Sequence, residues 1–351
     1  METIAFLHYN LGHLGGSQKV AVNIANELSS SFDVHLISMK GAISESYNIN
    51  ENVKKFDLSN TSNIIAAFKL NRYLLDNNVK LIAFMGTGCC YCLPFISGKI
   101  KVLVSEQSNV RNKVYMASRK TRLNHYLAAM RADKVVTLTQ SDKEAWMDKY
   151  KLSDDRIGVI HNYCEVRNNT VPVKENRIIT IGSFDPVKGY EYLVEVADKV
   201  LKDTDYTWHL YAMGENDYKN TILNLIKEKG MNNFIVEQPQ SDLSSVYTKA
   251  RINVMTSRNE GLPLSLIEAK LYGCVNVSFD CITGPAEVIK DGEDGYLVEC
   301  YDTDNMANKI IELINDEDKT EAFAEKAIQD NRFDKEGVIN AWKTTIQTLL
   351  K

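Results

Sequence analysis

Two carboxylates in the second half of the chain lie close enough in sequence to act on one ligand. The segment Ser257–Gly273, SRNEGLPLSLIEAKLYG, carries Glu260 and Glu268 with seven uncharged residues between them. Pro263 suits the first turn of a helix, where a missing N–H leaves no hydrogen bond unmade. The pattern therefore predicts a helix over about residues 262–271 that ends near the glycine.

The start of this predicted helix is a natural anion site. The amides of Gly261, Leu262 and Leu264 are backbone donors without intrahelical acceptors, at the positive end of the helix. Glu268 lies about 7–8 Å further along, at about 1.5 Å per residue. One carboxylate can then accept hydroxyls of a transferred sugar and the other hydroxyls of a ribose, with a diphosphate between them. Spacing alone leaves open a plainer alternative, an amphipathic helix with two surface glutamates.

The composition indicates an ordinary globular protein of two domains. The chain has 351 residues, 44% of them hydrophobic and 25% charged, which is long for one core. The net charge of −5 argues against a general nucleic-acid binder. The first residues, METIAFLHYN, show no secretory signal, and seven cysteines then read as reduced thiols in a cytosol.

One uncharged segment, Leu81–Gly98, invites a membrane-span interpretation that the sequence rejects. LIAFMGTGCCYCLPFISG is interrupted by glycines and a proline and barely reaches spanning length. A buried strand over Leu81–Met85, a glycine turn and a short buried helix fit better. Cys89 and Cys92 have C-x-x-C spacing, but no second pair follows at ligand spacing, so buried cysteines are favoured over a zinc or redox site.

Strand-like and helix-like segments alternate along the whole chain, which is typical of an α/β protein with parallel sheets. The pattern relaxes over residues 163–176 and then restarts. We therefore predict two doubly wound Rossmann-like domains, residues 1–164 and 165–335, facing each other across a ligand cleft. A last amphipathic helix, residues 336–351, is expected to pack back on the first domain.

These features together resemble one known family. EGLPLSLIE matches the E-x7-E motif of the retaining GT-B glycosyltransferases of family 4. Four further segments resemble this family's motifs in the same order: LGGSQKVAVNIANEL at Leu14–Leu28, VIHN at Val159–Asn162, IGSFDPVKGYEYLVEVA at Ile181–Ala197 and ITGPAEVIKDGEDGYLV at Ile282–Val298. The resemblance covers nearly the whole chain and implies the GT-B fold.

The resemblance also implies roles for individual residues. Lys188 matches the lysine that neutralises the donor diphosphate and leaving group, Glu260 the carboxylate on the transferred sugar, and Glu268 the ribose contact. Gly15 and Gly16 match the turn that approaches the phosphates and sugar, where only glycine has room. The expected interdomain hinge is Asn162. Further expected donor contacts are Ser183, Gly214, Gln238, Gly261, Leu262, Pro263 and Leu264.

Three departures from the family pattern concern charge and catalysis. Ser183 stands where many members have an arginine beside the phosphate lysine. Gly214 is followed by Glu and Asn where G-x-G is usual. Gln107 stands where relatives with an E-H pair have histidine, which leaves Glu106, His13 or neither to take over any role of that histidine.

The acceptor side is expected in the first domain. Residues 107–132 contain no Asp or Glu, and apolar residues alternate with the cations. Such a stretch suits an anionic membrane surface or the diphosphate of a lipid-linked acceptor, and a solvated basic helix is the alternative. The cations assigned to acceptor or membrane are Arg111, Lys113, Arg119, Lys120 and Arg122.

The family resemblance implies a retaining transfer of a hexose or N-acetylhexosamine from a UDP-sugar to a lipid-linked or surface-polysaccharide glycan. Neither a metal nor another cofactor is expected, and DTD at Asp302–Asp304 suits a helix cap instead. The expected location is the cytoplasmic face of the inner membrane. Two alternatives stay open: a sugar-nucleotide epimerase or hydrolase of the same fold, and a non-catalytic nucleotide-binding scaffold.

Overall fold

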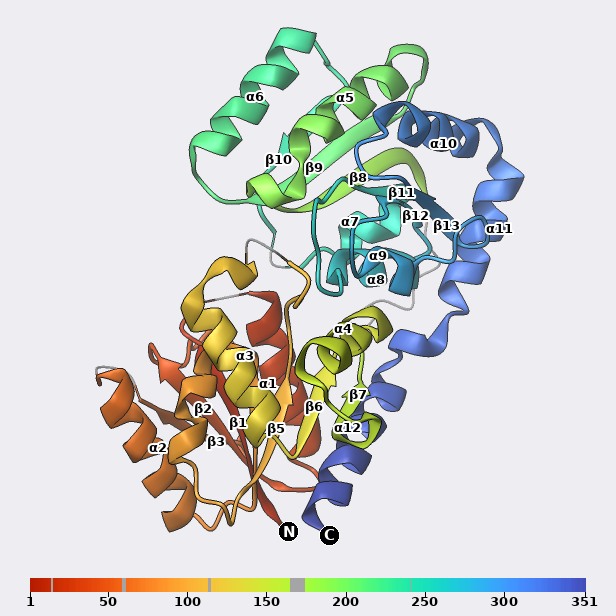
Figure 1. Ribbon diagram of the computed structural model, residues 1–351. Coiled ribbons are helices and arrows are strands. Elements are labelled where there is room, and N and C mark those ends of the chain that lie inside the picture. The colour runs from red at the N-terminus through yellow and green to blue at the C-terminus, as the bar shows by residue number, and fades with distance from the viewer. Residues whose placement is uncertain (14, 59–60, 113–114, 165–173, 241) are drawn as a thin grey trace. The chain divides into compact units, whose positions relative to one another are not determined.

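The computed structural model describes residues 1–351 except 14, 59–60, 113–114, 165–173 and 241 (Figure 1). The fold divides into two compact units. The first comprises Met1–Asn162 with Lys335–Lys351, and the second comprises Tyr163–Asp334. The predicted class of two doubly wound units with parallel sheets is confirmed.

The first unit is built on a seven-stranded sheet in the order β3-β2-β1-β4-β5-β6-β7, with every neighbouring pair parallel. Buried on both faces, its central strands read as continuous apolar runs. The strands are β1 Thr3–Asn10, β2 Asp33–Lys40, β3 Lys54–Asp57, β4 Leu81–Met85, β5 Lys101–Ser105, β6 Lys134–Thr137 and β7 Ile157–Val159.

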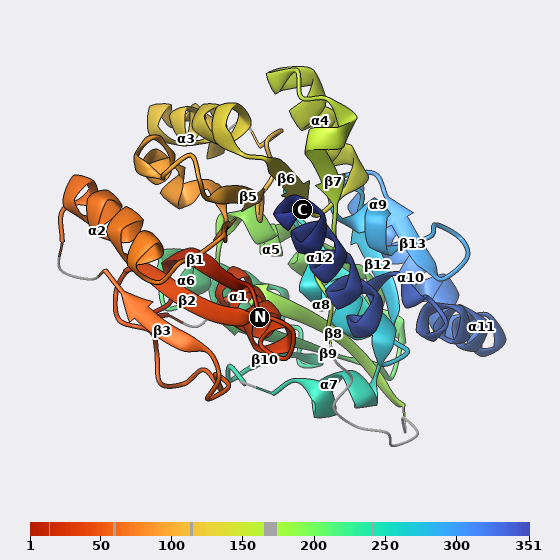
Figure 2. The ribbon, with the colours of Figure 1, turned by 90° about the horizontal axis from the view of Figure 1, so that it is seen from below.

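Helices cover both faces of this sheet (Figures 1 and 2). One face carries α2 Asn63–Asp76, the 3-10 helix η1 Thr87–Phe95, α3 Arg119–Arg131 and α4 Gln140–Tyr150. The other carries α1 Gly16–Leu28 and α12 Lys335–Leu350. Two short 3-10 helices, η2 Tyr115–Ala117 and η3 Asp154–Arg156, complete the unit.

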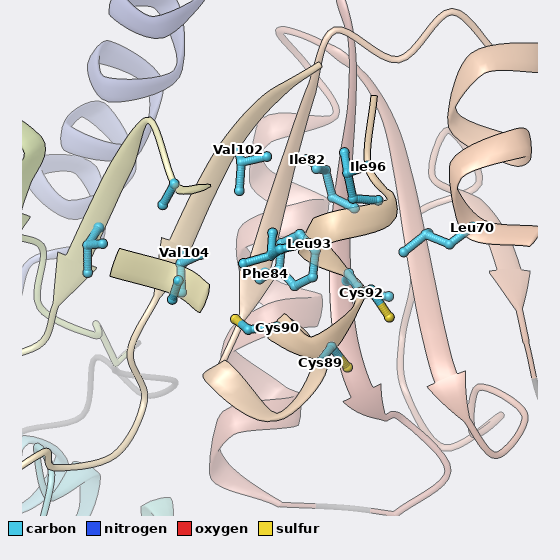
Figure 3. Close-up of a cluster of buried hydrophobic side chains, with 14 of the residues drawn as sticks. Leu70, Ile82, Phe84, Cys89, Cys90, Cys92, Leu93, Ile96, Val102 and Val104 are labelled. Carbon is cyan, nitrogen blue, oxygen red and sulfur yellow. The ribbon is translucent and has the colours of Figure 1, made fainter. Parts of the chain in front are cut away.

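The uncharged segment 81–98 lies in the core of the first unit, as predicted (Figure 3). Its strand is β4, Leu81–Met85, and Gly86 turns the chain at a φ of 101°, where a side chain would strain the backbone. Cys89, Cys90 and Cys92 then point into the apolar cluster from η1. Burial raises the pKa of the Cys92 thiol to about 12, so this thiol stays protonated and packs as a small apolar group. No helix in the described ranges is both long and apolar enough to cross a membrane.

Helix α12 returns to the first unit and contacts α1 and β4 there (Figure 2). Its buried residues are Val338, Trp342 and Ile346, which recur every fourth residue on one face. The Trp342 ring meets Phe6 of β1 edge-on at 6.2 Å between centroids. The amphipathic pattern therefore predicted both the helix and its buried face.

The second unit has a six-stranded parallel sheet in the order β10-β9-β8-β11-β12-β13. Its strands are β8 Glu175–Ser183, β9 Thr207–Met213, β10 Phe234–Glu237, β11 Ala250–Met255, β12 Val275–Phe279 and β13 Gly295–Val298. The first strand begins at Glu175, inside the linker expected over residues 163–176.

Short polar side chains cap the N-termini of several helices of the second unit. Asn216 accepts from the Lys219 amide at the start of α6, and Asp302 accepts from the Asn305 amide at the start of α10, as the DTD pattern predicted. The elements are η4 Pro186–Lys188, α5 Tyr190–Val200, η5 Leu201–Asp203, α6 Asp217–Lys229, α7 Ser244–Lys249, α8 Leu264–Leu271, α9 Pro285–Val288, α10 Thr303–Asn315, α11 Glu317–Ile328 and η6 Asn331–Phe333.

Candidate functional site

The second sheet brings Lys188 and Glu260 together, although 72 residues separate them. The strand order reverses direction between β8 and β11, and ligands bind at the carboxyl ends of strands flanking such a point. Lys188 follows β8 and Glu260 follows β11. The Lys188 Nζ lies 2.7 Å from Glu260 Oε1, with the two side chains 23% and 13% exposed. This ion pair therefore lies at the edge of the sheet formed by the carboxyl ends of its strands, where a ligand can reach it.

The backbone around Lys188 is shaped to place its side chain. Asp185 caps the short helix η4 by accepting from the Val187 amide at 2.9 Å. Gly189 then turns at a φ of 62°, and a Cβ there would lie 2.5 Å from the Thr256 carbonyl oxygen. Only glycine permits that approach, so the K-G pair of the motif has a steric reason.

Arg258 ties the Lys188 loop to the Glu260 loop. Its amide donates to the Val187 carbonyl at 2.7 Å, and its guanidinium bonds to the Pro186 carbonyl and to Glu191. The guanidinium also lies over the Tyr192 ring, 4.9 Å from the centroid. Through these contacts Arg258 acts as a brace between the Lys188 loop and the Glu260 loop.

The Glu260 loop rests on the last family motif. Thr283 donates its hydroxyl to the Glu260 carbonyl at 2.5 Å. Gly284 follows at a φ of 97°, and a Cβ there would lie 2.5 Å from the Gly261 carbonyl oxygen. The G-P of this motif therefore fixes the loop that carries the first glutamate.

Helix α8 starts two residues later than predicted. It spans Leu264–Leu271, and Pro263 is its N-cap with a φ of −75° and an extended ψ of 106°. The proline therefore lies before the first turn, not inside it, and the prediction of Leu262 as the start was wrong. Glu268 lies on the second turn, where the Tyr247 hydroxyl donates to its Oε2 at 2.8 Å.

The other predicted donor residues end the neighbouring strands. Ser183 is the last residue of β8, Gly214 follows β9 at a φ of 116°, and the exposed Gln238 follows β10. The parallel register brings these strand ends to one edge of the sheet. Gly261 and Leu262 lie in the Glu260 loop, with Leu262 buried.

In the first unit the strand order reverses between β1 and β4. Gly16 opens α1 after β1, and Gly15 is its N-cap with an extended φ of −166°. His13 is exposed, and its carbonyl accepts from the Tyr47 hydroxyl at 2.6 Å. His8, which the sequence reading missed, is buried in β1 and contacts the Ser17 hydroxyl at 3.2 Å.

Glu106 lies in the interior of the first unit. It is 1% exposed, and its Oε2 lies 2.5 Å from His125 Nε2 on α3. Burial disfavours charge on both groups, but their mutual attraction outweighs it, so the pKa of His125 is raised and that of Glu106 lowered. Glu106 therefore holds α3 in place. Gln107 donates to Ser105 at 2.7 Å and accepts from the expected hinge residue Asn162 at 3.4 Å.

The basic residues assigned to the acceptor side are exposed where the structure describes them: Arg111, Arg119, Lys120 and Arg122. Lys113 lies outside the described residues. The Lys120 ammonium lies 5.7 Å from the Tyr9 ring at the end of β1 and 5.8 Å from the Tyr91 ring of η1. One cation of this group therefore lies beside the ligand-binding edge of the first sheet.

Four positioning residues escaped the sequence reading: His125, Tyr247, Arg258 and Thr283. Arg258 and Thr283 lie inside the motifs quoted above, close in sequence to Glu260 and Gly284, so their positions could have identified them as candidates. Nothing local marked His125 or Tyr247, because their partners are 19 and 21 residues away on other elements.

Two family models match consecutive parts of the chain. The model described as Glycosyltransferase Family 4 matches residues 14–166, and the model described as Glycosyl transferases group 1 matches residues 165–330. They meet at residues 165–166, close to the division between the two compact units, and the second model covers Lys188, Glu260 and Glu268.

Named relatives and a solved structure agree with these models. The amylovoran biosynthesis glycosyltransferase AmsD of Erwinia amylovora is 26% identical, covering 97% of this chain and 99% of its own. The GalNAc-α-(1→4)-GalNAc-α-(1→3)-diNAcBac-PP-undecaprenol α-1,4-N-acetyl-D-galactosaminyltransferase of Campylobacter jejuni is 24% identical, covering 94% and 93%. HepE of Anabaena, solved in complex with UDP, has the same fold, with a TM-score of 0.85 at 19% identity over 99% and 100% of the chains. The predicted resemblance is confirmed: the chain belongs to the family 4 glycosyltransferases of the GT-B fold.

Proposed function

We propose that this glycosyltransferase moves a hexose or N-acetylhexosamine from a UDP-sugar, with retention, to a lipid-linked or surface-polysaccharide glycan. The observation that carries the proposal is the Lys188–Glu260 pair at the strand-order reversal, directly before α8. UDP in the HepE complex supports the nucleotide. The amylovoran and undecaprenol-linked glycans in the relatives' names support the acceptor class.

In this proposal Lys188 stabilises charge, and Glu260 and Glu268 orient the donor. Lys188 stabilises the charge that develops on the leaving diphosphate, together with the amides at the start of α8. Glu260 accepts hydroxyls of the transferred sugar, and Glu268, oriented by Tyr247, accepts those of the ribose. No metal ion is required for this step.

The bond changes follow from retention. The bond from the anomeric carbon to the diphosphate oxygen breaks, and a bond to the acceptor hydroxyl oxygen forms on the same face of the sugar. The acceptor proton passes to the departing phosphate oxygen. We place the reaction at the cytoplasmic face of the inner membrane, where a lipid-linked acceptor would present its glycan.

The test is UDP release from a panel of UDP-sugars, with and without a membrane-lipid extract. We expect lipid-stimulated release from one sugar and a lipid product heavier by one sugar. Release that is equal without acceptor would instead support an epimerase or hydrolase. Thermal stabilisation by UDP without any turnover would contradict the transferase and support a scaffold.

A further inference from the structure

Helix α3 carries three of its four large apolar side chains on the outside, and the fourth, Leu127, is half-buried against the core. Leu123, Tyr126 and Met130 are 54%, 55% and 66% exposed. The buried face of the helix is formed by small or polar residues: Asn124, His125, Ala128 and Ala129. A surface helix of a water-soluble domain normally has the opposite distribution, so the outer face of α3 requires an explanation.

The rotation of α3 is fixed from within. His125 lies 2.5 Å from the buried Glu106 and contacts the Thr121 carbonyl at 2.8 Å. Asn124 donates to the Gly88 carbonyl at 3.2 Å, and the Arg131 guanidinium donates to the Ile100 carbonyl at 3.0 Å. Turning the outer residues inward would break a buried ion pair, which typically costs several kcal/mol. The apolar face therefore stays outside.

Helix α2 extends this surface by way of η1. Ile64 and Phe68 of α2 are each more than half exposed, and the Phe68 ring meets Phe95 of η1 at 4.9 Å between centroids. At the other side of η1 the Lys120 ammonium of α3 lies 5.8 Å from the Tyr91 ring. Both helices contact η1. We call the surface formed by Ile64, Phe68, Tyr91, Phe95, Leu123, Tyr126 and Met130 the α2–α3 face.

The charges around the α2–α3 face are positive on the α3 side. Arg119, Lys120 and Arg122 are exposed, and residues 107–132 contain no Asp or Glu, although the whole chain has a net charge of −5. On α2, Lys69 is exposed as well, whereas the exposed Arg72 is paired with Asp76 at 3.5 Å and so adds little net charge. Apolar side chains bordered by cations suit the boundary between lipid headgroups and acyl chains, where phosphates lie just above hydrocarbon.

We infer that the α2–α3 face docks on an anionic phospholipid bilayer, an inference that rests on the proposed membrane-borne acceptor. Leu123, Tyr126, Met130, Ile64 and Phe68 enter the interface, and the cations of α3 bind headgroup phosphates. The sequence reading assigned only residues 107–132 to a membrane or a diphosphate. The structure adds α2 and η1 and makes the outer face of α3 the contact.

The test is vesicle co-sedimentation of the full chain with phosphatidylcholine alone and with added phosphatidylglycerol. We expect binding only with the anionic lipid. The triple variant Leu123→Ser, Tyr126→Ser, Met130→Ser and the double variant Ile64→Ser, Phe68→Ser should each bind at least tenfold more weakly. Arg119→Gln with Arg122→Gln should lose about fivefold per cation. Ile328→Ser, which removes an equally exposed apolar residue from α11, should bind as the unaltered chain does.

Two readouts separate this inference from the proposed function. Circular dichroism and stabilisation by UDP verify that the serine variants are folded, and UDP release in detergent with extracted lipid needs no vesicle. Vesicle binding without transferase turnover would leave the docking surface intact and contradict the function. Equal vesicle binding by folded serine variants would overturn the docking surface. A dimer abolished by the same variants, without vesicle binding, would overturn it in favour of a second copy of the chain.

Discussion

At the scale of single residues, the Lys188–Glu260 pair combines the two charges that the proposed reaction needs. An ammonium alone would attract any phosphate, and a carboxylate alone would repel the diphosphate of the donor. Paired at 2.7 Å, each holds the other in place at the strand ends. In the proposed reaction, a diphosphate that reaches Lys188 would share this ammonium with Glu260, which would couple phosphate binding to the orientation of the Glu260 carboxylate.

Removing either member should stop turnover without unfolding the protein. We expect Lys188→Ala and Glu260→Gln each to lower kcat by about 10²–10³-fold, because each removes charge aimed at the transition state. Both side chains are partly exposed, so the melting temperature should change little. The measurement is UDP release at saturating donor, with Lys227→Ala on the exposed face of α6 as control. A folded Lys188→Ala variant with most of its activity would count against the assignment.

Asp142 makes the stability of the first unit depend on pH. Its Oδ1 accepts from the Val110 amide at 3.0 Å, while its buried Oδ2 has no hydrogen-bond partner among the described residues. Burial, followed by the charge of Glu106, raises the pKa of Asp142 from 3.8 to about 7, against the opposing effects of the Val110 amide, His125 and Arg111. Folding then favours the protonated acid. The contribution of Asp142 to the free energy of unfolding is therefore largest below pH 3.8 and is lost as the pH rises to about 7.

The Asp142→Asn variant should remove this dependence, since the amide oxygen can still accept from Val110 and cannot ionise. We expect its free energy of unfolding to equal that of the unaltered chain near pH 4. At pH 8 it should exceed it by on the order of 1–3 kcal/mol. Urea unfolding at pH 4, 6 and 8 measures the difference. A difference that is the same at all three pH values would show that ionisation of Asp142 is not its source.

At the scale of elements, the site depends on how two loops are fastened together. Gly189 and Gly284 let backbone segments approach at distances that a Cβ would forbid, and Thr256 and Thr283 bond across the same contacts. From the Glu260 loop, the Arg258 side chain bonds to both η4 and α5.

Loss of the Arg258 brace should misplace Lys188 relative to Glu260. We expect Arg258→Met to lower kcat by about 10–100-fold, because displacements near 1 Å can cost that much. UDP binding, measured by thermal stabilisation, should change far less than kcat, which separates positioning from donor affinity. Arg258→Lys keeps the charge but not the forked geometry, so it should recover only part of the rate. Full activity of Arg258→Met would leave the brace without a role.

At the scale of the whole molecule, the chain ends in the unit in which it began. Helix α12 supplies Trp342, which is 2% exposed and packs on Phe6 of the central strand β1. The last residues therefore complete the core of the first unit, on the face of its sheet opposite α3.

Trp342→Ala should destabilise the first unit by about 3–5 kcal/mol, the usual cost of removing a buried tryptophan. Guanidinium unfolding followed by circular dichroism measures this, and Thr344→Ala on the exposed side of α12 should change the stability by less than about 0.5 kcal/mol. An equal effect of both variants would show that α12 does not contribute to this core.

Local patterns in the sequence were sufficient for the fold class, the buried strand and helix of residues 81–98, the cap at Asp302 and the buried face of α12. Each depends on residues within a few turns of one another, where apolar periodicity and capping chemistry act directly. Pro263 shows the limit: the sequence placed it in the first turn, and its extended ψ makes it the cap instead.

Contacts between distant residues needed the tertiary structure. The sequence contained Lys188 and Glu260 as separate motif members, but only the crossing from β8 to β11 sets them 2.7 Å apart. The sequence showed basic and apolar residues alternating near α3, but it could not show which face points outward. That face is decided by the buried pair of Glu106 and His125, because turning the helix would separate the two groups and leave the Glu106 carboxylate buried without His125.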